Sequence, residues 1–156
     1  MIKVANDTDF STKEIKALAG IVDRAFKKSF VYPPLRLVTL AHGSERNSWG
    51  GRYAGGGHIV LNLGKDVRFP NKWQIARSDE VIPLDTWEDW FVAMLSWCLM
   101  LHFQASVYDK TRLAGAKPRR KFIRKDAEEM SARLLKRWRV DSNLDLIKGK
   151  VDLDEI

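Results

Sequence analysis

The sequence predicts a single α+β domain in which helices pack on a small mixed or antiparallel sheet. Three observations predict it. A chain of 156 residues suits one hydrophobic core. Three segments repeat apolar residues at helical spacing, and two short segments between the first and second of them alternate as strands do. We place the domain at residues 1–140 and a C-terminal tail at residues 141–156.

The first element is a helix that begins after Ser11. Ser11 and Glu14 form an S-x-x-E capping box, in which the hydroxyl accepts from the Glu14 amide. Apolar residues then recur at helical spacing from Ile15 to Phe26. Lys27 and Lys28 suit the last turn, where cations favour the helix dipole.

Two strands follow, at residues 35–41 and 58–64, because apolar residues alternate in both segments. Residues 42–57 between them are rich in glycine and polar residues, which predicts a loop or a loose hairpin. Residues 69–83 contain two prolines and no clear period, and we expect a surface connection there.

The second helix starts with Asp85 or Thr86 as N-cap and continues to about Ala105. It is apolar on most of its circumference, which predicts a position in the middle of the fold. We expect a basic loop over residues 108–121 and a last helix over residues 122–140. The apolar stripe predicted for that last helix contains Ile123, Ala127, Met130, Leu134 and Trp138.

Within the second helix, Cys98 and His102 stand four residues apart and so share one face. That spacing is the one by which the two histidines of H-E-x-x-H bind zinc, with the glutamate as general base. In this chain Cys98 takes the first ligand position and Leu99 takes the position of the general base.

Three stretches with this arrangement are similar to parts of a known family: "GRYAGGGHIVLNLG", "DTWEDWFVAMLSWCLMLHFQ" and "RKDAEEMSARLLKRWR". The chain resembles a zincin-like metallopeptidase domain of the SprT-like or phage and mobile-element kind. The resemblance implies an N-terminal helix, a small sheet whose edge strand precedes the active helix, and a degenerate H-E-x-x-H motif. It also implies a third, acidic ligand, for which Asp126 is the candidate.

The departures from the family motif predict a protein that does not catalyse peptide hydrolysis. Without a carboxylate at position 99, no residue stands ready to take a proton from a zinc-bound water. Two ligands alone do not hold zinc, so we favour core packing for Cys98 and His102. The alternative is a zinc-dependent hydrolase with a Cys98, His102 and Asp126 site.

Positive charge is concentrated near the C-terminus. The segment Lys110–Arg139 holds twelve Lys and Arg against three Asp and Glu, whereas the net charge of the whole chain is +7. Such a segment can follow the phosphate backbone of a nucleic acid. The residues predicted to contact phosphates are Lys117, Arg119, Arg120, Lys121, Arg124, Lys125, Arg133, Lys136 and Arg137. The alternative is a solvated helix face with pairs such as Glu129 and Arg133.

We therefore expect a non-catalytic binding protein with a pseudo-metallopeptidase core and nucleic acid, or another acidic molecule, as its partner. A third reading is a module that binds a polypeptide in the inherited cleft. The single cysteine and the lack of an apolar signal core in "MIKVANDTDF" predict a cytoplasmic protein. The resemblance implies that a phage or mobile element encodes it. Residues 90–103 are expected to be too short to span a bilayer, so no membrane partner is predicted.

Overall fold

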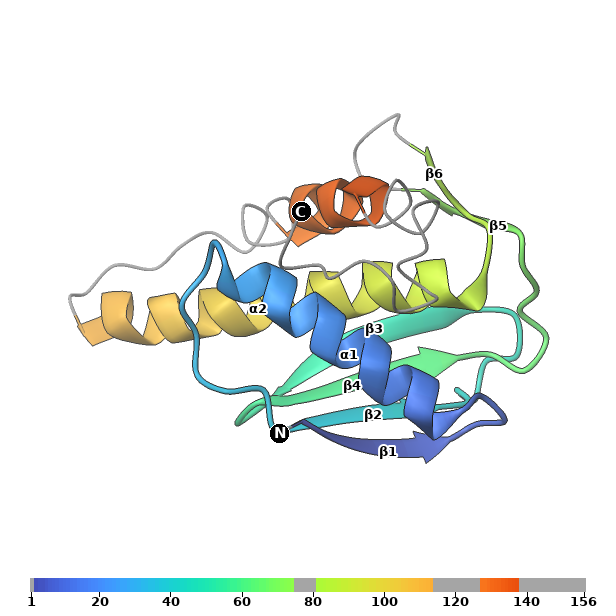
Figure 1. Ribbon diagram of the computed structural model, residues 1–156, viewed down its shortest axis with the longest axis horizontal. Coiled ribbons are helices and arrows are strands. Elements are labelled where there is room, and N and C mark those ends of the chain that lie inside the picture. The colour runs from blue at the N-terminus through green and yellow to red at the C-terminus, as the bar shows by residue number, and fades with distance from the viewer. Residues whose placement is uncertain (1, 75–80, 114–126, 138–156) are drawn as a thin grey trace.

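A computed structural model describes residues 2–74, 81–113 and 127–137 of the chain. The fold is α+β, as predicted, and helices cover one side of a four-stranded sheet (Figure 1). Residues 127–137 form a helix called here the 127–137 helix. The other elements, in chain order, are β1 (Lys3–Asp7), α1 (Thr12–Lys27), β2 (Leu37–Ala41), β3 (Trp49–Gly55), β4 (His58–Leu63), β5 (Asn71–Gln74), β6 (Val81–Leu84) and α2 (Trp87–Leu113).

The main sheet has the strand order β1-β2-β4-β3. The first three strands run parallel, so that Val38 of β2 pairs with Val4 on one side and with Ile59 on the other. Strand β3 is antiparallel to β4 and forms one edge of the sheet. The face that carries Val38, Ile59 and Leu61 is buried beneath the helices, and these three side chains are fully buried.

Four strands, β1, β3, β5 and β6, differ from the sequence prediction. Strand β1 precedes the first helix and was not predicted. Strand β3 lies within the segment predicted as a loop or loose hairpin, and the hairpin interpretation is the correct one. The turn to β4 is made by Gly55, Gly56 and Gly57, all at positive φ, which glycine adopts at little cost. The predicted surface connection contains the two-stranded antiparallel hairpin of β5 and β6.

Helix α1 begins as its sequence predicts. Ser11 is the N-cap, and its hydroxyl accepts from the Glu14 amide at 3.3 Å. The helix ends at Lys27, with Lys28 as C-cap. One face, which includes Ile15, Val22 and Phe26, is buried in the core. The amphipathic pattern therefore fixes which side of α1 faces water.

Helix α2 crosses the middle of the fold and packs against β3, β4 and α1. Its first turn is capped by Thr86, whose hydroxyl accepts from the Asp89 amide at 3.2 Å. The helix continues to Leu113, so the basic loop predicted from residue 108 is wrong for residues 108–113. The rest of that predicted loop, residues 114–121, lies outside the described part of the chain.

The apolar part of α2 is longer than expected. Residues Trp87–Val107 are long and apolar enough to cross a membrane by length and composition alone, so the prediction that this segment is too short was wrong. Most of the segment is buried inside the protein, which is also the case for the core helix of a globular domain.

Candidate functional site

Cys98 lies in the core beneath the edge strand β3. Its side chain is fully buried, as predicted. A Cβ atom at Gly51 of β3 would lie only 2.9 Å from the Cys98 sulfur, so the backbone of β3 passes directly over the thiol. Burial raises the pKa of the Cys98 thiol to about 12. Cys98 is therefore a protonated thiol at neutral pH and a poor nucleophile.

His102 is also buried, one turn further along α2, and it has a structural partner. Its Nε2 atom donates a hydrogen bond of 2.6 Å to the carbonyl oxygen of Pro33. Since a carbonyl only accepts, the proton must be on Nε2. The rings of Tyr32 and Tyr53 flank the imidazole, with ring centroids 5.6 and 5.0 Å away. His102 therefore ties α2 to the loop between α1 and β2.

These residues do not fit a zinc ion. Leu99 is fully buried at the position where the family motif has its general base. Nε2 of His102 donates to Pro33, Nδ1 of His102 is buried without a hydrogen-bond partner among the described residues, and β3 encloses the sulfur of Cys98. Within the described ranges no three His, Cys, Asp or Glu side chains come together as a possible metal site. Asp126 lies outside those ranges.

A buried polar contact beside His102 was not predicted. Asp23 of α1 is buried, and its carboxylate accepts from the Tyr32 hydroxyl at 2.7 Å and pairs with Lys27 at 2.8 Å. Burial, followed by the hydrogen bond to Asp23, raises the pKa of Tyr32 well above its usual range. The contact holds the loop after α1 in place and so positions Pro33 against His102. A tyrosine next to two prolines gave no sequence signal for a buried partner nine residues earlier.

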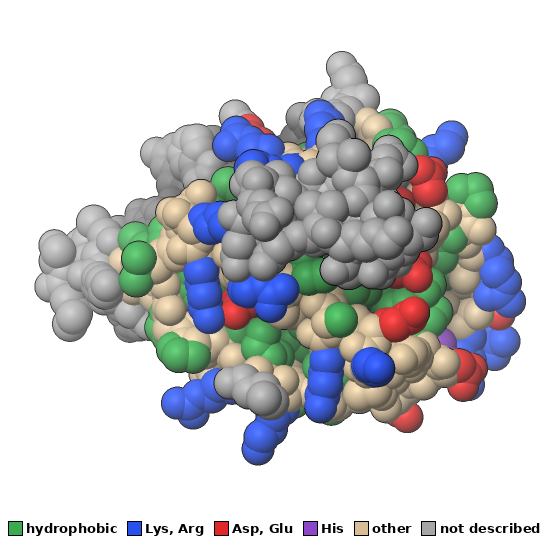
Figure 2. Space-filling model, viewed as in Figure 1, with side chains coloured by type: hydrophobic (Ala, Val, Ile, Leu, Met, Phe, Trp, Pro, Cys, Tyr) green, Lys and Arg blue, Asp and Glu red, His purple; other side chains and the backbone are tan. Residues whose placement is uncertain are grey.

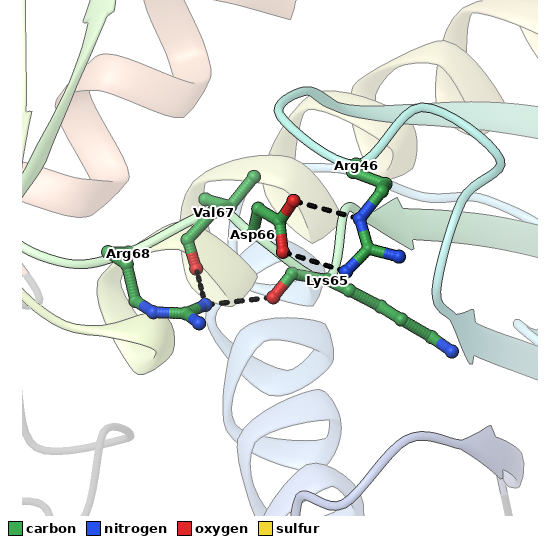
Figure 3. Close-up of polar contacts among 5 residues, drawn as sticks. All are labelled: Arg46, Lys65, Asp66, Val67 and Arg68. Atoms are coloured by element: carbon green, nitrogen blue, oxygen red, sulfur yellow. Dashed lines mark hydrogen bonds and ion pairs between the residues drawn. The ribbon is translucent and has the colours of Figure 1, made fainter.

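The loops at the carboxyl ends of β2 and β4 are joined by polar contacts (Figure 3). Arg46 binds both carboxylate oxygens of Asp66, at 2.8 and 3.1 Å. The Arg68 guanidinium donates to the carbonyls of Lys65 and Val67 within the same turn. Because Arg46 and Asp66 are exposed, their pair contributes little to stability. The cluster fixes the conformation of these loops.

The other two histidines also have structural partners. His58 Nε2 is 2.9 Å from the Thr39 hydroxyl, and His42 Nδ1 is 3.0 Å from the carbonyl oxygen of Leu63. Each contact joins β2, or the residue after it, to β4. Each histidine therefore has one ring nitrogen in a structural contact, whereas the Nδ1 atom of His102 is buried without a hydrogen-bond partner among the described residues.

The 127–137 helix presents basic residues to solvent. Its buried side consists of Ala127, Ser131, Ala132 and Leu135, and the Ser131 hydroxyl donates to the Ala93 carbonyl of α2. Met130 and Leu134, which we predicted at the centre of the apolar stripe, are only partly buried. The buried face of the 127–137 helix is thus rotated by about one residue position from the predicted apolar stripe.

Three of the predicted phosphate-contacting residues can be placed. Arg133, Lys136 and Arg137 are exposed on the 127–137 helix, as their assignment requires. The other six, Lys117, Arg119, Arg120, Lys121, Arg124 and Lys125, lie outside the described residues, and their positions stay predictions. Ile123 and Trp138, the remaining members of the predicted stripe, lie there as well.

A second basic surface lies on α1 and was missed by the sequence reasoning. Lys13, Lys16 and Arg24 are exposed on the side of α1 that faces away from the core. Figure 2 shows basic side chains along the front of the molecule, where α1 runs. The summed charge of the chain outside Lys110–Arg139 did not reveal these cations, because the tail at residues 141–156 carries five acidic residues against two lysines. The helical period of these cations was the signal that could have found them.

Comparisons with known proteins add no relative. The sequence matches no protein-family model, and neither the curated proteins nor the solved structures contain a match to this chain.

Proposed function

We propose that this protein is a non-catalytic binding protein that carries a basic nucleic-acid-binding surface on a pseudo-metallopeptidase core. The observation that carries the proposal is that the degenerate motif is buried while the basic residues are exposed. The side chains of Cys98 and His102 are buried in the core. Arg133, Lys136 and Arg137 are instead exposed on a helix in the most basic segment of the chain. Such a segment favours a polyanion as partner.

Part of the element order supports the pseudo-metallopeptidase core. Helix α1 precedes most of the main sheet, and β3 is an antiparallel edge strand that precedes the buried central helix α2 in the chain. The resemblance does not account for β1 before α1, or for β4, β5 and β6 between β3 and α2. Leu99 supports the non-catalytic part of the proposal, because an aliphatic side chain at the general-base position cannot accept a proton from water.

A salt titration of nucleic-acid binding tests the proposal. Arg119, Arg120 and Lys121 are changed together to alanine, and binding to a labelled mixed-sequence oligonucleotide is measured by fluorescence anisotropy. Each lost phosphate contact should lower the magnitude of the salt slope by about 0.9 on a duplex, or roughly 2.7 for the three together. A control that removes three exposed cations elsewhere, Lys3, Arg52 and Lys72 changed to alanine, should leave the slope nearly unchanged. Equal slopes in the wild type and the Arg119/Arg120/Lys121 variant would contradict the proposal.

A second candidate is a module that binds an extended polypeptide along β3. The observation in its favour is that β3 is an edge strand, so its outer backbone groups have no partner strand in the described sheet. Edge strands can accept an added strand from a peptide. Copurification of one specific protein, together with no affinity for oligonucleotides at low salt, would favour this function over the first.

A further inference from the structure

We propose that the exposed face of α1 is a second phosphate-binding surface, one that contacts the phosphodiester backbone of a nucleic acid. The inference rests on the proposed function, but it concerns a different part of the molecule. Helix α1 lies far from Lys110–Arg139 in the sequence, and the reasoning that led to the proposed function did not use it.

The geometry of α1 places its cations along one line. With 3.6 residues per turn, positions 13, 16, 20 and 24 of α1 fall on the same side of the helix. Lys13 and Lys16 occupy one end of this line and Arg24 the other, with Ala17 and Gly20 between them. The Arg24 guanidinium extends back over Gly20, where a Cβ atom would lie 3.5 Å from its Nη1 atom, so its charge lies between the ends of this line.

These cations are free to bind an anion. Within the described part of the chain, none of Lys13, Lys16 and Arg24 forms an ion pair with an acidic side chain. Of the two acids in α1, Asp23 is buried and already bonded to Tyr32 and Lys27. Glu14 in the first turn is the other. The surface of α1 therefore has an excess of positive charge that is not neutralised locally.

The composition of this face favours a polyanion over a membrane or an ordinary protein partner. The large apolar side chains that are strongly exposed among the described residues are Val31, Val81 and Val107, and none of them lies in α1. A helix that lies in a membrane interface inserts an apolar face, whereas the apolar face of α1 is buried in the core. A protein interface usually contains aromatic or aliphatic anchors, which this face lacks.

The spacing of the cations suits several consecutive phosphates. Lys13 and Arg24 are eleven residues apart, which corresponds to about 16 Å along the helix axis. Phosphates on one strand of a duplex rise by about 3.4 Å each, so this length covers roughly five phosphate steps. Three flexible side chains at these positions can each neutralise a separate phosphate and release its counterion.

The test compares two charge-matched triple variants. The first changes Lys13, Lys16 and Arg24 to alanine. The second is the control at Lys3, Arg52 and Lys72, which are exposed on β1, β3 and β5, with Lys3 and Arg52 on the sheet face that the helices leave uncovered. Both remove the same net charge, and thermal unfolding verifies that both variants keep their fold. The probes are duplex and single-stranded DNA of one mixed sequence, and binding is measured across a salt series. Comparing the two probes shows whether the surface prefers a duplex or a single strand.

For the α1 variant we expect roughly tenfold weaker binding at low salt and a salt slope smaller in magnitude by about 2 to 3. The control should change much less. If the wild type binds DNA and the two variants have the same affinity and salt slope, the proposal of a second surface is wrong while the proposed function stands. If the wild type binds neither probe, both proposals fail. Binding of the wild type to phosphatidylserine vesicles but not to DNA would overturn the inference by identifying a different class of partner.

Discussion

Cys98 and His102 illustrate how one residue spacing serves two purposes. An i, i+4 pair on a helix brings two side chains to the same face, whether that face holds a metal or a core. Here β3 covers the thiol and Pro33 accepts from the imidazole, so both residues act in packing. The sequence could predict that the pair shares a face and is buried. It could not predict Pro33 as partner, because the contact spans 69 residues.

The buried thiol makes a testable contribution to alkaline stability. The pKa of Cys98 rises from its usual 9.0 to about 12 in the folded protein. Above pH 9 the unfolded chain loses this proton while the folded protein keeps it, so the free energy of unfolding falls as pH increases. The slope from this thiol alone is about 1.4 kcal/mol per pH unit up to the folded pKa.

We expect a Cys98→Ala variant to lose that part of the pH dependence. Urea unfolding at a series of pH values above 9 should give a shallower decline for the variant than for the wild type. Tyr32, whose pKa is also raised, is present in both proteins and cancels in the comparison. Identical declines in the two proteins would mean that the Cys98 thiol ionises freely in the folded state.

At the scale of elements, the helices were more predictable than the strands. The cap at Ser11 and the apolar period of α1 depend on nearby residues and could be read directly. Strand β1, "KVAND", contains residues that are uncommon in strands, and its pairing with β2 provides its conformation. Strand β3 is rich in glycine, partly because Cys98 and Leu61 leave no room for a side chain at Gly51. Such causes lie in distant residues, which local patterns do not contain.

The connection after α1 provides a prediction about how two elements are joined. Removing the Tyr32 hydroxyl in a Tyr32→Phe variant leaves the buried Asp23 carboxylate without one of its partners. We expect a loss of about 1 to 2 kcal/mol in the free energy of unfolding, measured by urea denaturation.

Tyr53→Phe is the matched control, since the Tyr53 ring also flanks His102, and among the described residues its hydroxyl accepts a hydrogen bond only from the Gly57 amide, at 3.5 Å. The control should cost less than about 0.5 kcal/mol, because that hydrogen bond is long and weak. Equal losses in the two variants would show that the hydrogen bond to Asp23 stabilises the protein no more than the weak contact with Gly57.

For the whole molecule, the α+β class and the basic character followed from composition and periodicity. The distribution of charge over the surface did not. Averaging along the chain assigned all excess positive charge to Lys110–Arg139, but folding buries Asp23 and turns the cations of α1 to one side. Charge that is balanced in the sequence can thus be unbalanced on the surface.

The zinc content of the whole protein can also be predicted. Because the Cys98 and His102 region does not fit the ion, protein purified without added zinc should contain far less than one equivalent by elemental analysis. A chelator should leave the thermal unfolding temperature unchanged, since no bound metal would contribute to folding. Stoichiometric zinc whose stabilising effect disappears in an Asp126→Asn variant would support the hydrolase alternative instead.

The strand order of the main sheet also has a consequence for how the chain assembles. Strands β3 and β4 are joined by the short glycine turn, so their pairing closes a very small loop. The pairing of β1 with β2 must instead enclose all of α1 and the segment that follows it. Since the entropy lost on closing a loop grows with its length, the sheet is entropically cheap to form at its β3 edge and costly at its β1 edge. The protein therefore has one sheet edge that closes a short loop and one sheet edge that closes a loop containing a whole helix.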